Sequence, residues 1–285
     1  MDTAAAAKAR RELIAFYLDA GVNAAIGEAP IDRFADEAGS QTAKAIAGLG
    51  EEASAKQPQA DKLESSLAVP VNGGWAVPKQ PSTPASPEAA VMAAREVAKS
   101  APTLEALRAL LERFEGCMLR ATATQLVFAD GNPKSRVMFV GEAPGRDEDI
   151  AGLPFVGRSG KLLDLMMAAI GLDRSKAYIA NIVPWRPPGN RTPTPQESAI
   201  CLPFILRQIE LADPDVLVCL GQPSTQTLLG TKEGITRTRG RWFKFNTGRR
   251  EIRALPTYHP AFLLRSPLQK RLAWRDFLAL QKTLS

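Results

Sequence analysis

The 285-residue sequence predicts an α/β protein with three α/β/α layers, in which helices cover both faces of a central, mostly parallel, four-stranded sheet. Two observations predict this class. Four short runs are apolar almost throughout, and a longer stretch with helical spacing separates each run from the next. Strands that are apolar on both faces and alternate with helices are typical of a parallel sheet buried between helical layers.

The first hundred residues differ in composition from the rest. Residues 7–20 have apolar positions near helical spacing, which predicts an amphipathic helix within an N-terminal extension spanning 1–48. Residues 49–100 are rich in Ala, Pro, Ser, Gln and Glu, and such a composition buries too little apolar surface to offset its ordering entropy. We therefore expect a flexible linker over 49–100 and a compact domain over 101–285.

Capping residues, turn residues and the spacing of apolar positions predict the helices and strands of the compact domain. Thr103 is suited to cap a helix over 104–114, and Asn246-Thr247-Gly248 between two apolar runs predicts a hairpin before the last strand. Strands are expected at 136–140, 178–183, 215–220 and 252–258, and further helices at 159–170, 195–211, 224–229 and 268–283.

Charge and cysteine content narrow the functional class. Residues 101–285 hold 26 basic and 17 acidic side chains, whereas residues 1–100 hold 10 and 13, so the net charge of +6 comes from the C-terminal part. A basic excess suits a phosphate-rich partner such as nucleic acid, although a solvated basic surface explains it equally well. With three widely spaced cysteines, no signal sequence and no long apolar run, we expect a cytoplasmic protein without a membrane span.

Polar residues follow the ends of the predicted strands. Glu142 lies in the Gly141–Gly145 loop after the first strand, Asn181 lies in the second strand, and His259, the only histidine, follows the fourth. Ligands of open α/β sheets bind outside the carboxyl ends of the strands. An acid, an amide and an imidazole are therefore expected to meet at one edge of the sheet.

Four motifs in this order resemble the uracil-DNA glycosylase superfamily. They are G-E-A-P-G-R-D-E-D at 141–149, G-L-P-F-V-G at 152–157, Asn181 ahead of R-P-P at 186–188, and H-P-A-F-L-L-R at 259–265. The likeness covers roughly residues 111–284 and is closest to family 4, the iron–sulfur branch. It implies an enzyme that flips uracil out of DNA and hydrolyses its N-glycosidic bond, leaving an abasic site.

The resemblance implies a pocket for the flipped base, which must leave the helical stack to be reached. Phe155 matches the family's stacking aromatic, with Gly141 and Ala143 beside it. Asn181 matches the residue that reads uracil, since one side-chain amide complements the O4 acceptor and the N3–H donor. Cytosine inverts that pattern and would leave buried groups unpaired.

The resemblance also implies catalytic and DNA-contacting roles. His259 matches the donor to uracil O2 in the leaving anion, and Glu142 matches the acid that positions water. Glu148 is the candidate for excluding the 5-methyl group of thymine. In contact with DNA, Leu263 would fill the hole left by the base and Arg265 would meet a phosphate, with Arg186 also on the DNA side. The implied partner is uracil-containing DNA, bound by a monomer.

The chain departs from family 4 at the iron–sulfur ligands. Cys117 and Cys201 match two of the four cysteines, but Phe114 and Trp185 occupy the other two positions. A cubane cluster is normally held by four thiolates, so we expect no cluster, no metal and no organic cofactor. The third cysteine, Cys219, lies within a predicted core strand, where packing accounts for it.

Two other functions remain open on the residues alone. The Gly141–Gly145 loop also suits a nucleotide-binding hydrolase or transferase, although neither a Gly-Lys-Ser/Thr nor a Rossmann glycine triplet accompanies it. A non-catalytic DNA-binding module with the same fold is the other alternative. Retention of Glu142, Phe155, Asn181 and His259 favours a working enzyme.

Overall fold

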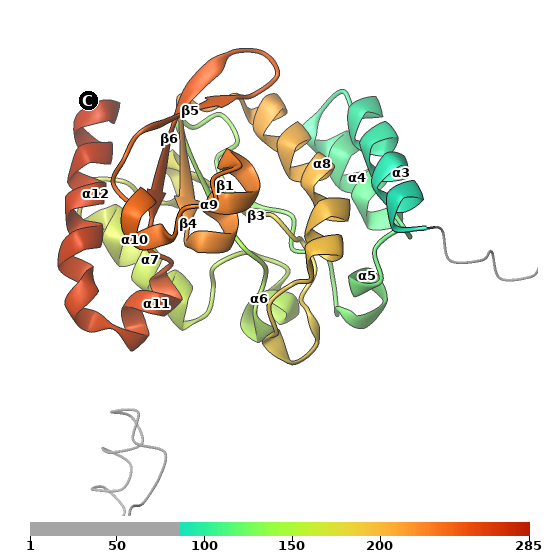
Figure 1. Ribbon diagram of the computed structural model, residues 1–285, viewed down its shortest axis with the longest axis horizontal. Helices are drawn as coiled ribbons and strands as arrows, with labels where there is room; N and C mark the ends of the chain where they lie inside the picture. Colours follow the sequence, from blue (N-terminus) through green and yellow to red (C-terminus); the bar gives the residue numbers. More distant parts are fainter. Residues whose placement is uncertain (1–85) are drawn as a thin grey trace, which may run out of the picture. The chain divides into compact units, whose positions relative to one another are not determined.

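The computed structural model describes residues 86–285, which form a sheet with helices on both faces (Figure 1). The predicted helix at 7–20, the extension over 1–48 and the linker up to residue 85 lie outside the described residues. Within residues 86–285, no helix combines the length and the apolar content that a membrane crossing requires.

The sheet has six strands: β1 (Asp130–Gly131), β2 (Val137–Gly141), β3 (Tyr178–Asn181), β4 (Val216–Leu220), β5 (Phe243–Asn246) and β6 (Glu251–Thr257). Their order in the sheet is β1-β3-β2-β4-β6-β5. Its four central strands run parallel, which confirms the predicted mostly parallel core, and β5 pairs antiparallel with β6 as the predicted hairpin. The predicted count of four is wrong, because β5 and a two-residue strand, β1, extend the edges.

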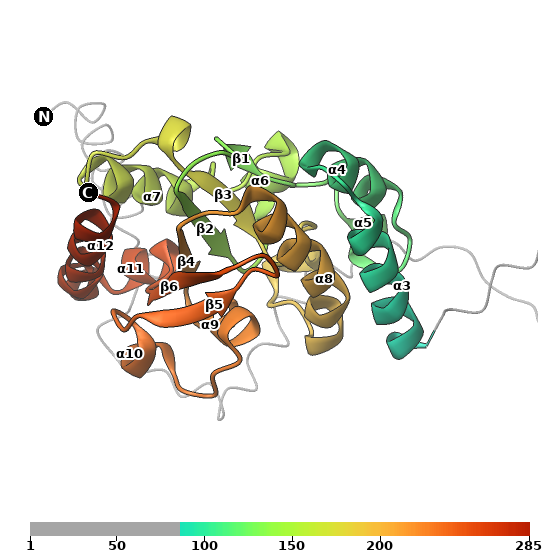
Figure 2. The same cartoon turned by 90° about the horizontal axis from the view of Figure 1, so that it is seen from above.

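Alternate side chains of the central strands enter two separate cores. In β2, Val137 and Phe139 pack with α7 (Arg158–Ala168) and α12 (Lys270–Leu284), whereas Met138 and Val140 pack with α8 (Pro195–Ala212) and the helices beside it. This two-sided burial is why the strands are apolar throughout. Figures 1 and 2 show α7 (Arg158–Ala168) and α12 (Lys270–Leu284) on one side of the sheet and α8 (Pro195–Ala212) on the other.

Residues 87–100 correct the predicted linker. They form α3 (Pro87–Ser100), whose first turn is capped by the Ser86 hydroxyl accepting the Ala89 N–H at 3.2 Å. Ala90, Ala94 and Ala98, spaced four apart, are buried in the core shared with α8. Small side chains allow the two helices to pack closely. The prediction failed because alanines within an Ala/Pro/Ser-rich stretch have the same composition as a flexible linker.

The helices predicted for residues 101–285 match the structure closely, and several short helices that were not predicted lie between them. The Thr103 hydroxyl accepts the Ala106 N–H at 3.2 Å and caps α4 (Leu104–Arg113), as predicted. The final predicted helix divides into a short turn and α12. The other elements are α5 (Leu119–Thr122), α6 (Arg146–Ala151), η2 (Arg174–Lys176), η3 (Pro188–Asn190), α9 (Gln222–Leu229), α10 (Ile235–Thr238), α11 (Pro260–Arg265) and η4 (Pro267–Gln269).

Strand register brings the predicted functional positions to one edge. Gly141 at the end of β2 pairs with Asn181 at the end of β3, and Leu220 of β4 pairs with Thr257 of β6. The chain leaves β2 toward β3 on one side, and later strands lie on its other side, so the strand order reverses at β2. Parallel sheets bind ligands at such a reversal, outside the carboxyl ends.

Candidate active site

A cavity of about 580 Å³ opens at the carboxyl edge of the four parallel strands. Its volume lies within the range of small-molecule sites. Loops after β2, β3, β4 and β6 all contribute to its lining, so segments more than a hundred residues apart in sequence form one site. The lining includes seven of the residues expected from sequence, namely Glu142, Ala143, Glu148, Phe155, Asn181, His259 and Arg265.

Asn181 presents an unsatisfied amide to this cavity. It is 4% exposed, and its Oδ1 atom is buried with no hydrogen-bond partner among the described residues. A Cβ at Gly141 would lie 2.4 Å from that oxygen and 2.6 Å from Cζ of Phe155. Only glycine therefore allows the amide and the aromatic ring to approach each other here. An unpaired buried polar atom is costly unless a ligand satisfies it.

His259 is held as a neutral imidazole. Its Nδ1 atom accepts the Ala261 N–H at 3.1 Å at the start of α11, which leaves the proton of the neutral ring on Nε2. Burial, aided by the positive charge of Arg265, lowers the pKa of His259 to about 4. Gly221 after β4 has φ +88°, and a Cβ there would lie 2.9 Å from the His259 Cβ. The imidazole is thus a fixed hydrogen-bond donor at neutral pH.

Phe155 and Glu142 complete the cavity around the imidazole. The ring centroids of Phe155 and His259 are 5.5 Å apart. Burial raises the pKa of Glu142, whose Oε1 atom is buried and without a partner in the described part of the chain. A desolvated carboxylate with a free acceptor is suited to orient or deprotonate a water molecule.

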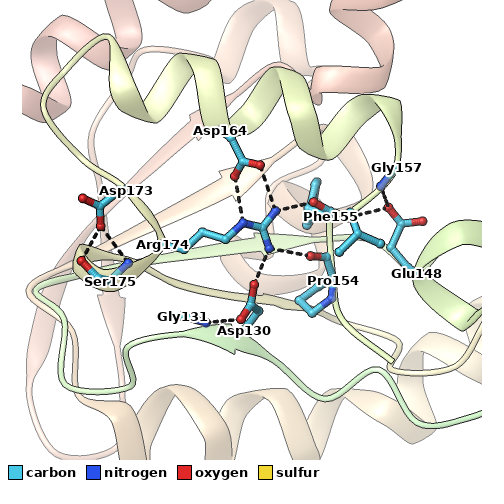
Figure 3. A network of polar contacts seen from close by, with 11 residues as sticks. Asp130, Gly131, Glu148, Pro154, Phe155, Gly157, Asp164, Asp173, Arg174 and Ser175 are labelled. Carbon is cyan, nitrogen blue, oxygen red and sulfur yellow. Dashed lines mark hydrogen bonds and ion pairs between the residues drawn. The ribbon is translucent and has the colours of Figure 1, made fainter. Parts of the chain in front are cut away.

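Glu148 connects two loops of the cavity by accepting hydrogen bonds from the backbone of both. Its Oε2 atom accepts the Gly145 N–H at 3.1 Å, and its Oε1 atom accepts the Val156 N–H at 3.1 Å and the Gly157 N–H at 2.9 Å. Figure 3 shows the bond to Gly157. Both oxygens are therefore engaged by backbone. This geometry favours a role in holding the pocket over direct contact with a base.

Residues 128–278, more than half of the chain, match the family model described as the uracil DNA glycosylase superfamily. The chain belongs to the uracil-DNA glycosylase superfamily. Its relatives include proteins named type-4 uracil-DNA glycosylase. The Thermotoga maritima relative is 42% identical over 164 residues, 57% of this chain and 84% of that protein. The Archaeoglobus fulgidus relative is 41% identical over 165 residues, 56% and 83% of the two chains.

Among superfamily features predicted from sequence, the Leu263 wedge is wrong. Leu263 is 0% exposed and packs with Tyr258 and Ala273, because the helical turn of α11 directs it into the core. The next side chain, Leu264, is 36% exposed. Arg265 is exposed and borders the cavity, and its predicted phosphate contact stays a prediction.

Arg186 is engaged within the protein. Its Nε atom donates to Asn190 Oδ1 at 2.7 Å, and its Nη1 atom lies 3.8 Å from Asp149 Oδ2. Asp149 also accepts the Thr124 N–H at 2.8 Å, so the pair ties the loop after β3 to the segment before β1. The predicted DNA contact by Arg186 stays a prediction, and these bonds give it a separate structural role.

Sequence reasoning missed several polar residues of the cavity wall, among them Arg191 and Gln222. Arg191 forms two hydrogen bonds to Glu197 at 2.6 and 2.8 Å, and Gln222 accepts the Ile235 N–H at 3.4 Å. Arg191 closely follows the R-P-P motif, which was the available signal. Gln222 is the second residue after β4, close to the strand end like the other site residues predicted from sequence.

The residues at the iron–sulfur positions do not fit a four-thiolate cluster. The Sγ atoms of Cys117 and Cys201 lie 3.9 Å apart and are buried, but Phe114 and Trp185 belong to the same packed core. Phe114 also packs edge-on against Phe204 with centroids 5.0 Å apart. Within residues 86–285, no group of three or more His, Cys, Asp or Glu side chains is placed to hold a metal ion.

Proposed function

We propose that this chain is a uracil-DNA glycosylase that flips uracil out of DNA, hydrolyses its N-glycosidic bond and leaves an abasic site. One observation carries the proposal. A free amide on Asn181, a neutral donor on His259 and a buried acceptor on Glu142 converge on one cavity beside the Phe155 ring. Membership of the superfamily and relatives named type-4 uracil-DNA glycosylase support it.

Asn181 selects the base in this mechanism. Its amide offers the acceptor that uracil N3–H needs and the donor that O4 needs. The Oδ1 atom without a partner supports this role, because a bound uracil would supply the missing hydrogen bond. Cytosine presents an acceptor at N3 and donors at N4, so its binding would leave the buried amide mispaired.

His259 stabilises the departing base. Cleavage of the glycosidic bond places negative charge on uracil, and the Nε2–H donor would meet that charge at O2. A preorganised donor in a water-poor site contributes strongly to such steps. The ring need not be protonated, because the bond from Ala261 N–H to Nδ1 already fixes the donor on the cavity side.

Glu142 directs water to the sugar. Once uracil departs, the sugar carries oxocarbenium-like positive charge, and a carboxylate both stabilises that charge and orients the attacking water. Phe155 would stack on the flipped ring. We propose further that Leu264, instead of Leu263, contacts the base stack from α11, and that Arg265 contacts a phosphate beside the site.

A strand-cleavage assay tests the proposal. A labelled single-stranded oligonucleotide with one uracil is incubated with the protein, treated with alkali and separated on a gel. We expect cleavage at the uracil only, with matched cytosine and thymine oligonucleotides intact. Glu142→Gln should slow the reaction by about 10² to 10⁴-fold. Tight binding without cleavage would indicate the non-catalytic DNA-binding module, and nucleotide hydrolysis without uracil release would indicate the alternative enzyme class.

A further inference from the structure

We propose that Arg174 is a positioning residue for uracil excision, which acts from outside the cavity by holding the backbone that presents Phe155. This inference rests on the proposed function, in which the Phe155 ring stacks on uracil. Arg174 lies in η2 just before β3, 19 residues after Phe155, and it is not part of the cavity lining. Arg174 lies outside the motifs from which the cavity residues were predicted.

Phe155 has a backbone conformation that needs support. Its φ of 54° is in the left-handed region, which a bulky residue rarely adopts. The neighbouring helix α7 comes so close that a Cβ on Gly160 would lie 1.7 Å from the Phe155 carbonyl oxygen. Backbone strain of this kind persists only where the surroundings hold it, and it concentrates at functional sites.

Arg174 binds the carbonyl groups of this strained segment (Figure 3). Its Nη1 atom donates to the Pro154 carbonyl at 3.1 Å, and its Nη2 atom donates to the Phe155 carbonyl. The same guanidinium pairs with Asp164 of α7, with Nε to Oδ1 at 2.9 Å, and with Asp130 of β1. The two carboxylates come from different elements and fix the plane of the fork, so its remaining donors face the loop.

Glu148 binds the backbone N–H groups of the same segment. It accepts hydrogen bonds from Val156 and Gly157, the two residues after Phe155. The backbone of residues 154–157 is thus held at both ends: Arg174 binds the carbonyls of the first two residues, and Glu148 binds the N–H groups of the last two. We call this arrangement the Phe155 clamp. The clamp fixes the Phe155 ring, whose centroid lies 5.5 Å from the centroid of the His259 imidazole.

Arg174→Lys is the variant of choice for the test. Lysine keeps the positive charge, but its single nitrogen cannot span two carboxylates and two carbonyls as the planar fork does. Arg250→Lys is a matched control. Arg250 also binds two carboxylates, those of Asp213 and Asp215, and two carbonyls, those of Asp213 and Pro214. These residues lie just before β4 and β6, at the amino ends of these strands and therefore away from the cavity at the carboxyl ends.

The first readout is hydrogen exchange of the peptide covering residues 153–158, followed by mass spectrometry on the full chain. Arg174→Lys should speed exchange of the Val156 and Gly157 amides by about tenfold or more, because their protection depends on the held loop. Arg250→Lys should leave this peptide unchanged. Equal protection in wild type and both variants would overturn the clamp. The measurement needs no activity, so it separates the clamp from the proposed function.

The second readout is single-turnover excision of uracil in a double-mutant cycle. Arg174→Lys should slow excision by about 10- to 100-fold, since a displacement of about 1 Å can cost that much. In a Phe155→Ala background the same change should cost less than about threefold, because the group it positions is gone. Equal losses in both backgrounds would show that Arg174 does not act through Phe155. Arg250→Lys should change the rate by less than about twofold in either background.

Asp130→Asn gives a second variant in case Arg174→Lys unfolds. It removes one carboxylate that orients the fork and leaves the two carbonyl contacts in place. It should move both readouts in the same direction by a smaller factor, with no change in the excision rate when Phe155 is Ala. Unchanged exchange and excision in this variant would contradict the clamp. A wild-type protein that releases no uracil would instead refute the proposed function, and the exchange result would still decide the clamp.

Discussion

The unusual pKa of His259 makes a sharp prediction about pH. The perturbation is acidification from pH 7.5 to 5.5, which would protonate an ordinary imidazole. Burial and Arg265 lower the pKa of this ring from 6.5 to about 4. Lowering the pKa keeps the neutral form populated as pH falls, and the neutral form is the one whose Nδ1 accepts the Ala261 N–H.

The structure sets the size of the effect. With a pKa of about 6.5 the neutral fraction would fall from about nine-tenths at pH 7.5 to about one-tenth at pH 5.5, and a rate that requires the ring held by the Ala261 N–H at Nδ1 would fall roughly tenfold. With a pKa of about 4 the ring stays almost entirely neutral over this range, and the contribution of His259 is constant. The two cases are easily separated.

Glu142 must be removed from the measurement, because burial raises its pKa and its own protonation would slow the wild-type enzyme as pH falls. The assay is therefore single-turnover excision by Glu142→Gln, with protein in excess over uracil-containing single-stranded DNA. We expect a residual rate that is flat between pH 7.5 and 5.5, because the His259 ring stays neutral over this range. A tenfold decrease in Glu142→Gln would refute a His259 imidazole that stays neutral over this range.

Three further predictions concern single residues and the cluster positions. His259→Ala should reduce single-turnover excision by about 10² to 10³-fold, because one donor to a developing anion is lost, with binding to uracil-containing DNA less affected; a loss of tenfold or less would give Glu142 or the backbone the larger share. Asn181→Asp should weaken uracil excision and favour acceptance of cytosine through its N4 amino group, and unchanged uracil kinetics would remove Asn181 from base recognition. Anaerobically purified protein should be colourless and free of iron, while Trp185→Ala should lower the free energy of unfolding by about 3–5 kcal/mol in a denaturant titration. Stoichiometric iron would contradict the packing of aromatic side chains at these positions.

The sequence alone determined the fold class and most of the site. Four apolar runs separated by helices leave few arrangements other than a parallel sheet, and the carboxyl ends of its strands necessarily share one edge. Glu142, Asn181 and His259 follow or end such strands, so their convergence was predictable and the cavity brings them together. The alanine stripe of α3 was not predictable, since alanine burial depends on whether another helix lies against it.

Only the tertiary structure decided which side chains face the cavity and which partners hold them. Leu263 and Leu264 are adjacent and chemically identical, and the packing of α11 turns one inward and the other outward. The tautomer of His259 depends on a backbone N–H, and the carboxylate of Glu148 is occupied by three such groups. Arg174 reaches the Phe155 carbonyl from beyond α7, and the helical periodicity of the residues between them does not indicate that contact. Periodicity reports burial and strand ends, whereas hydrogen bonds between distant segments exist only once the chain has folded.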